Sequence, residues 1–503
     1  MSGHADSLSG GRVAVVGGGL AGLAAAVALC RRGMNVELFE TRRRLGGRAS
    51  SFRDRETGQW IDRCQHVAMG CCTNLAHFCR QTGNDRCFDR HRRLHFFGPD
   101  AALYELAASR WLPAPLHLAP ALMRLGYLTL RDRLRILRAV GRLARTPADR
   151  NADQETIARW LRRHGQSEQA VEGFWSVVLL SALSETLEHI SLAAARKVFV
   201  DGFLAAEGAY ELEVPNLALE ELFGRRTTAW LTRHGAVVRA GTRVRQIEGD
   251  GERVAGVVLP DDSRRQFDYV VVAVPWRQVR PLFSAAMLEA LPSLARVDEI
   301  RSAPITAVHL WLDRSITPLP HAVLVGRTSQ WVFQAKRGRE SFAGTARRVL
   351  CTKDSRPLFG SGHYYQVVIS ASHDLAGRPG KEVAAEIWRE LGEIWPAARD
   401  ARLLRHRLIT QPSAVFSSWV GLDGIRPPQQ TPIANLALAG DWTRTGWPAT
   451  MESAVRSGYL AAEAILKTAG KPEKVLADDL PRGCLARWLL PSDEPSVNID
   501  HSV

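Results

Sequence analysis

Lysine is scarce in this chain of 503 residues, although the formal net charge at pH 7 is +14. The positive charge therefore comes almost wholly from arginine, and such a surplus favours anionic partners such as a nucleotide cofactor or an acidic membrane surface. The arginines are not interleaved with aromatic residues, and no recognisable nucleic-acid-binding motif accompanies them. We therefore expect no nucleic-acid partner.

Long hydrophobic runs are also lacking, with one exception near the start of the sequence. Residues 13–30 are nearly free of polar side chains and are about long enough for a signal peptide or a membrane-spanning helix. The preceding residues, 2–11, carry no cluster of positive charge, and three consecutive glycines interrupt the run. We therefore expect neither a secretory signal nor a membrane span, and we expect a cytoplasmic protein.

Cysteine pairs with the spacing of a zinc site are absent. Five of the eight cysteines lie between Cys64 and Cys87, but none of them forms a C-x-x-C pair. His66 and His77 nearby therefore give little support to tetrahedral zinc coordination. Reduced thiols in a cytosolic protein explain these cysteines better, and no metal site is predicted.

The run at residues 13–30 belongs instead to a dinucleotide-binding pattern. A β-branched stretch at 13–16 predicts a buried parallel strand, and an alanine-rich stretch at 20–30 predicts the helix that follows it. Three glycines between them have the spacing G-x-G-x-x-G, and they are Gly17, Gly19 and Gly22.

Each part of this pattern has a role in binding a pyrophosphate. Gly17 allows the tight turn, Gly19 lets the pyrophosphate approach the backbone, and Gly22 lets the helix and strand pack closely. The helix N-terminus stabilises the negative charge. A second strand, predicted over 35–39, ends in Glu40, where a carboxylate accepts hydrogen bonds from ribose hydroxyls. The motif alone leaves NAD and FAD open.

An arginine- and glycine-rich segment follows Glu40 directly, at residues 41–51. Taken alone, it is a basic turn or a set of arginines for the 2′-phosphate of NADP. Its R-x-G-G-R-x-x-S pattern resembles the extended FAD signature of the flavin amine oxidase and phytoene desaturase superfamily. The resemblance implies non-covalent FAD, with the second arginine neutralising the pyrophosphate. The cofactor-binding residues predicted in this segment are Arg42, Arg44, Gly46, Gly47 and Arg48.

A second segment with the superfamily's pattern lies far along the sequence. A strand predicted over 436–441 ends in Gly-Asp, and Pro448 suits the first turn of a following helix. The resemblance places this carboxylate near the ribityl and pyrophosphate groups of FAD, and the helix N-terminus near the flavin ring. It also implies that Val244, in a strand expected at 241–247, contacts the adenine. The predicted binding residues of the second segment are Gly440, Asp441, Pro448, Ala449, Thr450 and Met451.

These two segments predict a discontinuous α/β fold. We expect a Rossmann-like FAD-binding domain of the glutathione-reductase type with an interleaved α+β substrate domain, because a chain of this length exceeds one ordinary core. The FAD-binding domain is predicted at 12–95, 206–285 and 430–470. The substrate or membrane-facing domain is predicted at 96–205 and 286–429, with a C-terminal tail at 471–503.

Residues after a predicted hairpin at 51–62 narrow the resemblance to one branch of the superfamily. Residues 62–73 read Asp-x-x-Gln-His-x-x-x-Gly-x-x-Thr, which is similar to the squalene-associated FAD enzymes, the hydroxysqualene dehydroxylases. This chain has Arg63-Cys64 where members commonly carry Asn-Gly. The resemblance implies reductive removal of the hydroxyl of hydroxysqualene, giving squalene for hopanoid synthesis.

Such a reaction needs a proton donor and groups that tolerate transient positive charge. His66 is the candidate donor, because a histidine can be tuned near neutral pH, and ionised Asp62 is its candidate partner. The alternative is that His66 hydrogen-bonds the backbone and holds its loop in place. The ring faces of Trp419, Trp442 or Trp447 are candidates for cation–π stabilisation.

Three other functions are weighed against dehydroxylation. Amine oxidation is disfavoured, because amine oxidases of the superfamily place a lysine and an aromatic residue where this chain has Thr306 and Thr450. Desaturation of an isoprenoid or carotenoid uses the flavin in the opposite direction and is the main alternative. A non-catalytic flavoprotein scaffold is less favoured, because both flavin segments are intact.

A leucine- and arginine-rich segment at 112–145 is the predicted membrane contact. Its arginines recur at three- and four-residue steps, whereas Leu134, Leu137 and Val140 lie on another helical face. The pattern fits either an ordinary surface helix or a peripheral membrane patch. The expected partners are a hydrophobic isoprenoid substrate, a membrane surface and squalene-pathway enzymes.

Overall fold

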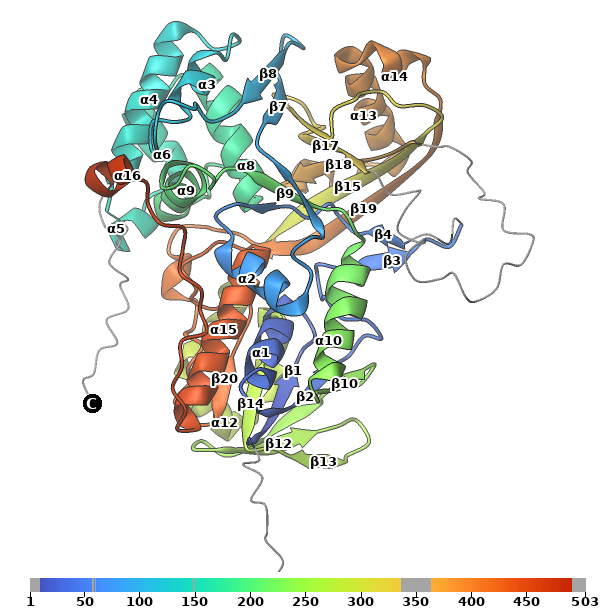
Figure 1. Ribbon diagram of the computed structural model, residues 1–503, viewed down its shortest axis with the longest axis vertical. Coiled ribbons are helices and arrows are strands. Elements are labelled where there is room, and N and C mark those ends of the chain that lie inside the picture. The colour runs from blue at the N-terminus through green and yellow to red at the C-terminus, as the bar shows by residue number, and fades with distance from the viewer. Residues whose placement is uncertain (1–9, 57, 59, 148–149, 336–362, 491–503) are drawn as a thin grey trace, which may run out of the picture.

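The computed structural model describes residues 10–490, except 57, 59, 148–149 and 336–362. Residue 57 of the predicted hairpin turn and residues 491–503 of the predicted tail lie outside the described residues. The molecule is elongated, with a parallel sheet at one end and a larger mixed sheet with a group of helices at the other (Figure 1).

The parallel sheet is built from strands that are far apart in the sequence. Its order is β10 (Val237–Ala240), β2 (Asn35–Glu40), β1 (Arg12–Val16), β14 (Tyr269–Val272) and β20 (Leu436–Leu438). β1 lies at the centre and pairs in parallel with β2 and β14. The predicted α/β class, with a strand–helix–strand start, is therefore confirmed.

Both faces of this sheet are buried, which explains the continuous apolar strand sequences. Val13 and Val15 of β1 pack toward helices, whereas Ala14 and Val16 pack toward the opposite face. The helical face carries α1 (Leu20–Cys30), α2 (Thr73–Thr82), α10 (Thr227–Arg233) and α15 (Met451–Thr468). The other face carries β11 (Gln246–Gly249), β12 (Val254–Val258), β13 (Arg264–Gln266), α11 (Trp276–Val279) and α12 (Ala285–Glu289).

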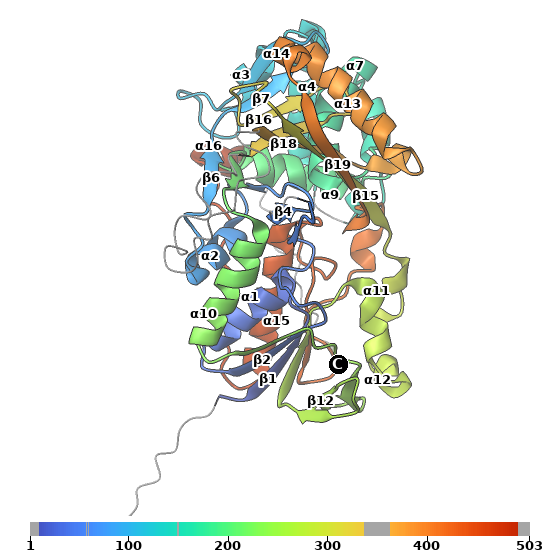
Figure 2. The same ribbon diagram turned by 90° about the vertical axis from the view of Figure 1, so that its right-hand side faces the viewer.

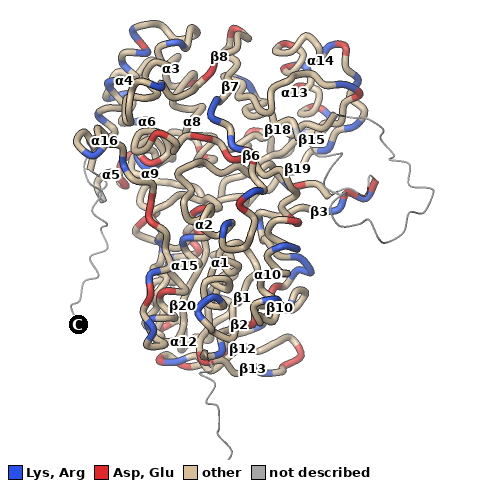
Figure 3. The backbone as a smooth tube through the Cα atoms, viewed as in Figure 1, with Lys and Arg blue, Asp and Glu red and all other residues tan. Residues whose placement is uncertain are grey.

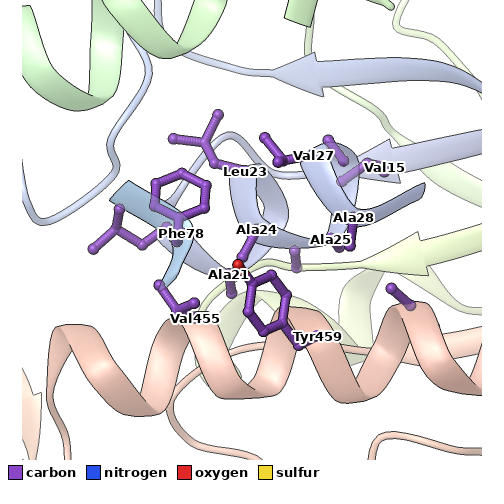
Figure 4. Packing of buried hydrophobic residues seen from close by; sticks show 14 of the residues in the cluster. Val15, Ala21, Leu23, Ala24, Ala25, Val27, Ala28, Phe78, Val455 and Tyr459 are labelled. Carbon is purple, nitrogen blue, oxygen red and sulfur yellow. The ribbon is translucent and has the colours of Figure 1, made fainter. Parts of the chain in front are cut away.

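Close packing of α1 against α15 joins the two predicted cofactor segments. Small side chains on α1 let α15 approach, and a Cβ at Gly458 of α15 would lie 2.2 Å from the carbonyl oxygen of Ala21. Tyr459, which is 1% exposed, packs against the alanines of α1, which include Ala21 and Ala24 (Figure 4). The run at 13–30 is thus a buried strand and helix, and the membrane-span alternative is excluded.

A seven-stranded mixed sheet forms the second half of the molecule (Figure 2). Its order is β19 (Leu403–Phe416), β15 (Ser302–Leu312), β18 (His363–Ser370), β17 (Trp331–Ala335), β16 (His321–Leu324), β7 (Leu94–Phe97) and β8 (Leu103–Leu106). One face is covered by α13 (Gly380–Ile394) and α14 (Pro396–Asp400). The predicted domain boundary at residues 95–96 falls inside β7.

Helices gather beside the other face of this sheet. They are α3 (Ala119–Met123), α4 (Leu130–Arg145), α5 (Arg150–Asp153), α6 (Ile157–Arg163), α7 (Glu168–Ala170), α8 (Val177–Leu183), α9 (Leu192–Phe199) and α16 (Cys484–Leu489). Smaller strands connect the halves: β3 (Ser51–Arg53), β4 (Trp60–Asp62), β5 (Ala68–Met69), β6 (Phe88–His91) and β9 (Leu212–Pro215). No helix in the described ranges is long and apolar enough to span a bilayer.

Two predicted elements are wrong. Residues 241–245 are not a strand, because β11 begins only at Gln246. Their backbone instead follows the end of β2, where the amide of Thr242 donates to the carbonyl oxygen of Glu40 at 2.9 Å. The helix expected at Pro448 begins at Met451, because the side chain of Thr450 caps it by accepting from the amide of Ser453.

Candidate active site

A cavity of about 1090 Å³ begins at the carboxyl ends of β1 and β2 and continues to the helices and mixed sheet of the other half. It is lined by most of the predicted cofactor residues, which are Gly17, Gly19, Glu40, Arg42, Gly46, Gly47, Arg48, Val244, Gly440, Asp441, Pro448, Ala449, Thr450 and Met451. The fold therefore brings both predicted segments to one place. Gly22, Arg44 and Asp62 do not line the described cavity.

The glycine turn after β1 has the close contacts that the motif predicts. Gly17 has φ +114°, and a Cβ there would lie 2.4 Å from the carbonyl oxygen of Ala273. A Cβ at Gly22 would lie 1.9 Å from the carbonyl oxygen of Gly17, so the helix and turn pack in direct contact. Gly19 lies against the cavity, where its backbone is open to a ligand.

The N-terminus of α1 is suited to an anion. Its N-cap residue, Gly19, provides no side-chain cap, and Leu20 and Ala21 of the first turn line the cavity. The first amides and the positive end of the helix dipole therefore face the cavity. Glu40 lies beside them, with its carboxylate accepting from the amides of Gly18 and Arg42, both at 2.8 Å. These residues fit the pyrophosphate and ribose of a dinucleotide.

Two predicted arginines differ in their surroundings. Arg48 lines the cavity, where its guanidinium pairs with the buried carboxylate of Asp441 and donates to the carbonyl oxygen of Ala414 at 3.1 Å. Arg48 therefore joins the first cofactor segment to the second. Arg44 lies outside the cavity, close enough to Glu220 to oppose the rise in the pKa of that carboxyl caused by burial.

A buried carboxylate next to the second segment fixes α2. Glu452 is fully buried and accepts from the amides of Asn74 and Leu75, at 3.2 and 2.8 Å. These amides belong to the first turn of α2, so Glu452 caps that helix from α15. Burial is the main cause that raises the pKa of Glu452.

His66 lines the cavity, and its Nδ1 lies 2.9 Å from the carbonyl oxygen of Cys64. A carbonyl only accepts, so Nδ1 carries the hydrogen and Nε2 is left as an acceptor in the neutral ring. Burial lowers the pKa of His66, which favours this neutral form. The contact matches the loop-holding alternative, and the role of His66 as proton donor stays a prediction.

Asp62 lies behind the cavity and is fully buried. Its carboxylate accepts from the hydroxyl of Ser51 at 2.6 Å and from the amide of Leu219 at 3.0 Å. Asp62 therefore ties the β3–β4 hairpin to the helical segment Glu220–Arg226. These contacts support a structural role, and the predicted catalytic partnership with His66 stays a prediction.

The walls of the cavity beyond the cofactor residues are apolar. Leu137 and Val140 of α4 contribute to them, so this part of the predicted membrane face points inward. The other apolar lining residues come from α8, α9, their flanking segments and the mixed sheet, and include Leu94, Phe96, Phe174, Val178, Phe199, Phe203, Trp331 and Phe333.

Two positions near the cavity were not identified from the sequence. Ile305 of β15 lines the cavity, whereas Thr306 is turned away and hydrogen-bonds to Ser372 and Thr410, both at 2.9 Å. Lys197 of α9 also lines the cavity. A basic residue within an ordinary helical pattern gives no sign of this placement.

The candidate tryptophans also differ. Trp442 and Trp447 line the cavity, and Trp419 does not. Trp442 is fully buried, and its indole nitrogen donates to the carbonyl oxygen of Val274 at 2.9 Å. Trp447 is the one of the three whose ring meets a lysine, because Nζ of Lys197 lies 4.8 Å from its centroid.

Comparisons with known proteins agree with this arrangement. The family model for flavin containing amine oxidoreductases matches residues 20–466. A hydroxysqualene dehydroxylase of Zymomonas mobilis subsp. mobilis is 26% identical, covering 90% of this chain and 98% of that protein. A probable zeta-carotene desaturase of Synechococcus elongatus is also 26% identical, covering 91% and 98%. Cyclohexylamine oxidase from Brevibacterium oxydans shares the fold, with a TM-score of 0.64 at 17% identity over 92% of this chain and 99% of that one.

Proposed function

Because the chain belongs to the family of flavin containing amine oxidoreductases, and is thus an FAD-dependent oxidoreductase, we propose that it removes the hydroxyl of hydroxysqualene to give squalene for hopanoid synthesis. The observation that supports this substrate is the cavity, whose apolar walls continue from the cofactor residues into the helical half. A long hydrocarbon chain loses contact with water along such walls. The pattern at residues 62–73, similar to that of the dehydroxylases, supports the choice of reaction.

The cofactor in this proposal is FAD, held without a covalent bond. The amides at the start of α1, with Gly17 and Gly19, would bind the pyrophosphate, and Glu40 would bind the ribose. The segment from Gly440 to Met451 would lie along the flavin. Reduced FAD supplies a hydride when bound.

The protein's own residues provide the surroundings for the substrate. Phe174 and Phe199 of the helical half, with Phe333 of the sheet, would exclude water and orient the chain. The buried contact of Trp442 with Val274 holds that ring in one position against the cavity. Water must be excluded from this part of the cavity until the hydroxyl oxygen has left the substrate.

Desaturation of an isoprenoid or carotenoid is the second candidate. A zeta-carotene desaturase matches this chain at the same identity as a dehydroxylase, and an apolar cavity suits a polyene as well. Amine oxidation gains no support, because neither Ile305 nor Thr306 supplies a lysine at the cavity. The scaffold alternative, with squalene-pathway enzymes as partners, stays a lesser prediction.

The reaction products separate the two candidates. We expect the purified protein, reduced without oxygen, to form squalene from hydroxysqualene in a single turnover while the flavin is reoxidised. Squalene formed in proportion to enzyme-bound flavin supports dehydroxylation. Flavin that stays reduced, together with conjugated double bonds formed from phytoene or zeta-carotene in air, would overturn it in favour of desaturation.

The membrane contact in this proposal is an anionic bilayer surface beside one end of the cavity. Leu116, Arg145 and Leu489 all line the cavity and are exposed, so they mark this opening. Two almost fully exposed tryptophans, Trp111 and Trp488, lie near it in the sequence, one before Leu116 and one within α16. Exposed aromatic rings and arginines together suit a bilayer interface with anionic headgroups.

Packing places these elements on the same side of the molecule. Ala486 and Leu490 pack with Ala114 and with Ala144 of α4. A hydrogen bond of 2.7 Å from the amide of Ser109 to the carbonyl oxygen of His117 closes the loop that carries Trp111 and Leu116. Figure 3 shows basic residues along α4 and on α16, which supply the positive charge.

A further inference from the structure

We infer that Lys197 recognises an oxygen atom on the substrate, so that the cavity takes a long apolar alcohol in preference to the corresponding hydrocarbon. This inference rests on the proposed function and names its substrate class more narrowly. It depends on where Lys197 lies, on which of its hydrogens are already used, and on what surrounds it.

Lys197 lies at the junction between the apolar half of the cavity and the second cofactor segment. It belongs to α9, whose neighbouring residues Val198 and Phe199 also line the cavity. Its Nζ lies 4.8 Å from the ring centroid of Trp447, which immediately precedes Pro448. An oxygen bound here would therefore sit where the substrate chain meets the cofactor residues.

The ammonium group of Lys197 is held in place but is not fully used. It has three N–H donors. Its charge is paired with Asp201, whose Oδ2 lies 2.7 Å from Nζ, and the group also lies over the ring of Trp447 as a cation–π contact. Donor capacity therefore remains for the cavity that Lys197 lines. The carboxylate of Asp201 also compensates the charge of the ammonium.

Charged residues elsewhere around the cavity lie mostly at its cofactor end. Those on the cofactor segments and beside them are Glu40, Arg42, Arg48, Arg243, Arg245, Arg277, Asp441 and Glu452. In the helical half, Arg145 is at the exposed opening. Among the described lining residues, this leaves Lys197 as the charged group where the apolar part meets the second cofactor segment.

An ammonium in that position disfavours a pure hydrocarbon. A polyene filling the cavity would strip water from this ammonium and give it no further acceptor, which costs free energy. A hydroxyl oxygen has lone pairs that accept this hydrogen bond. Lys197 would thus favour hydroxysqualene over squalene or a carotene, and would place the hydroxyl beside Trp447.

Ligand binding to the oxidised holoprotein tests this selectivity, because the reaction needs reduced flavin and no turnover occurs. Dissociation constants for hydroxysqualene and for squalene are measured from changes in the flavin absorbance. We expect wild-type protein to bind the alcohol about tenfold tighter or more, as for hydrogen bonds to charged groups. Lys197→Met should abolish that preference, because hydroxysqualene loses its hydrogen bond and squalene binds more tightly once no ammonium is desolvated, and Lys197→Arg should retain most of it.

The matched control is Lys467→Met, an exposed lysine of α15 away from the cavity, which should behave as wild type. A Lys197→Met protein that still prefers the alcohol would refute the inference, as would a wild-type protein without preference. If Lys197→Met does not fold, Lys197→Gln replaces it in the same comparison. Preference for the alcohol without squalene formation after reduction would refute the proposed function alone, whereas squalene formation without preference would refute the role of Lys197 alone.

Discussion

At the scale of single residues, backbone geometry near the cofactor is the strictest requirement. Gly47 has φ +61°, and a Cβ there would lie 3.0 Å from the Cα of Gly19, across the narrow passage between the two glycine segments. Gly33 has a similar φ of +75° but nothing within 4 Å of an added Cβ. A side chain at either position would therefore strain the backbone, but only a side chain at Gly47 would also meet a neighbouring residue.

Substituting alanine at Gly47 and, separately, at Gly33 distinguishes the effect of backbone strain on stability from the effect on cofactor binding. Each variant should lose on the order of 1–3 kcal/mol of unfolding free energy, because a left-handed conformation is unfavourable for alanine. Only Gly47→Ala should also lose flavin, by about tenfold or more in affinity, because its methyl group displaces Gly19. Flavin absorbance of the purified proteins and denaturant unfolding measure the two effects. Full flavin content in Gly47→Ala would contradict this account of the site.

The residues that could be predicted from the sequence are those with short-range constraints. Spacing alone identifies Gly17, Gly22 and Glu40, because the turn and the strand to which they belong are continuous in the chain. Lys197 could not be found in this way, because its ring partner, Trp447, comes from a distant segment. Asp62, the predicted partner of His66, ends β4 and binds Ser51 and Leu219 behind the cavity, which local spacing does not show.

At the scale of elements, the helix pattern predicted the existence of α4 but not the direction of its faces. The helix predicted from the spacing of its arginines and leucines is confirmed, because the residues from Leu130 to Arg145 are helical. Leu137 and Val140 nevertheless face the cavity, because α4 covers it. Hydrophobic periodicity shows which side of a helix avoids water, but it cannot distinguish a lipid surface from an internal cavity. The short helix α16 lies within the predicted C-terminal tail, and the sequence does not show its packing on Ala144.

The exposed rings of the loop and α16 give a test of the membrane contact. In flotation with anionic vesicles, the double variant Trp111→Ala, Trp488→Ala should bind at least about tenfold more weakly than wild type, because two large apolar groups no longer enter the interface. Neutral vesicles should bind the wild-type protein more weakly than anionic vesicles do, because the arginines then have no anionic headgroups to pair with.

The control for this experiment is Leu404→Ala, which removes an exposed apolar residue from β19 in the other part of the molecule. It should float as wild type does. Equal flotation of the double variant and the wild type would rule out the surface around Trp111 and Trp488 as the membrane contact.

At the scale of the whole molecule, contacts between distant segments hold the two halves together and could not be derived from local patterns. Asp153, the last residue of α5, accepts from the amide of Asp423 at 3.3 Å, in the segment that leads from β19 toward β20. Burial, with the nearby charge of Asp423, raises the pKa of Asp153 to about 6. Arg426 pairs with Asp423 at 3.1 Å and partly balances that charge.

This contact should make stability depend on pH. An unfolded aspartate titrates near pH ~3.9, so the folded protein binds the additional proton between that value and about 6. The contribution of Asp153 is therefore most favourable at low pH and is lost as pH rises through this window. Asp153→Asn should raise the melting temperature relative to wild type more at about pH 7.5 than at about pH 4.5. Thermal unfolding at the two pH values measures this difference, and an equal effect at both would contradict the assignment.

The late position of β20 and α15 in the chain has a consequence for biosynthesis. Until β20 leaves the ribosome, β14 has an open edge, and its valines have no neighbouring strand on that side. The alanine face of α1 likewise has no cover until α15 is made. The nascent chain therefore carries an apolar helix face through most of its synthesis, and an exposed β-edge from the completion of β14 until β20 is made, which makes it prone to aggregation. In the proposed function Asp441 and Thr450 lie along the flavin, so flavin loading would wait until both residues have been synthesised.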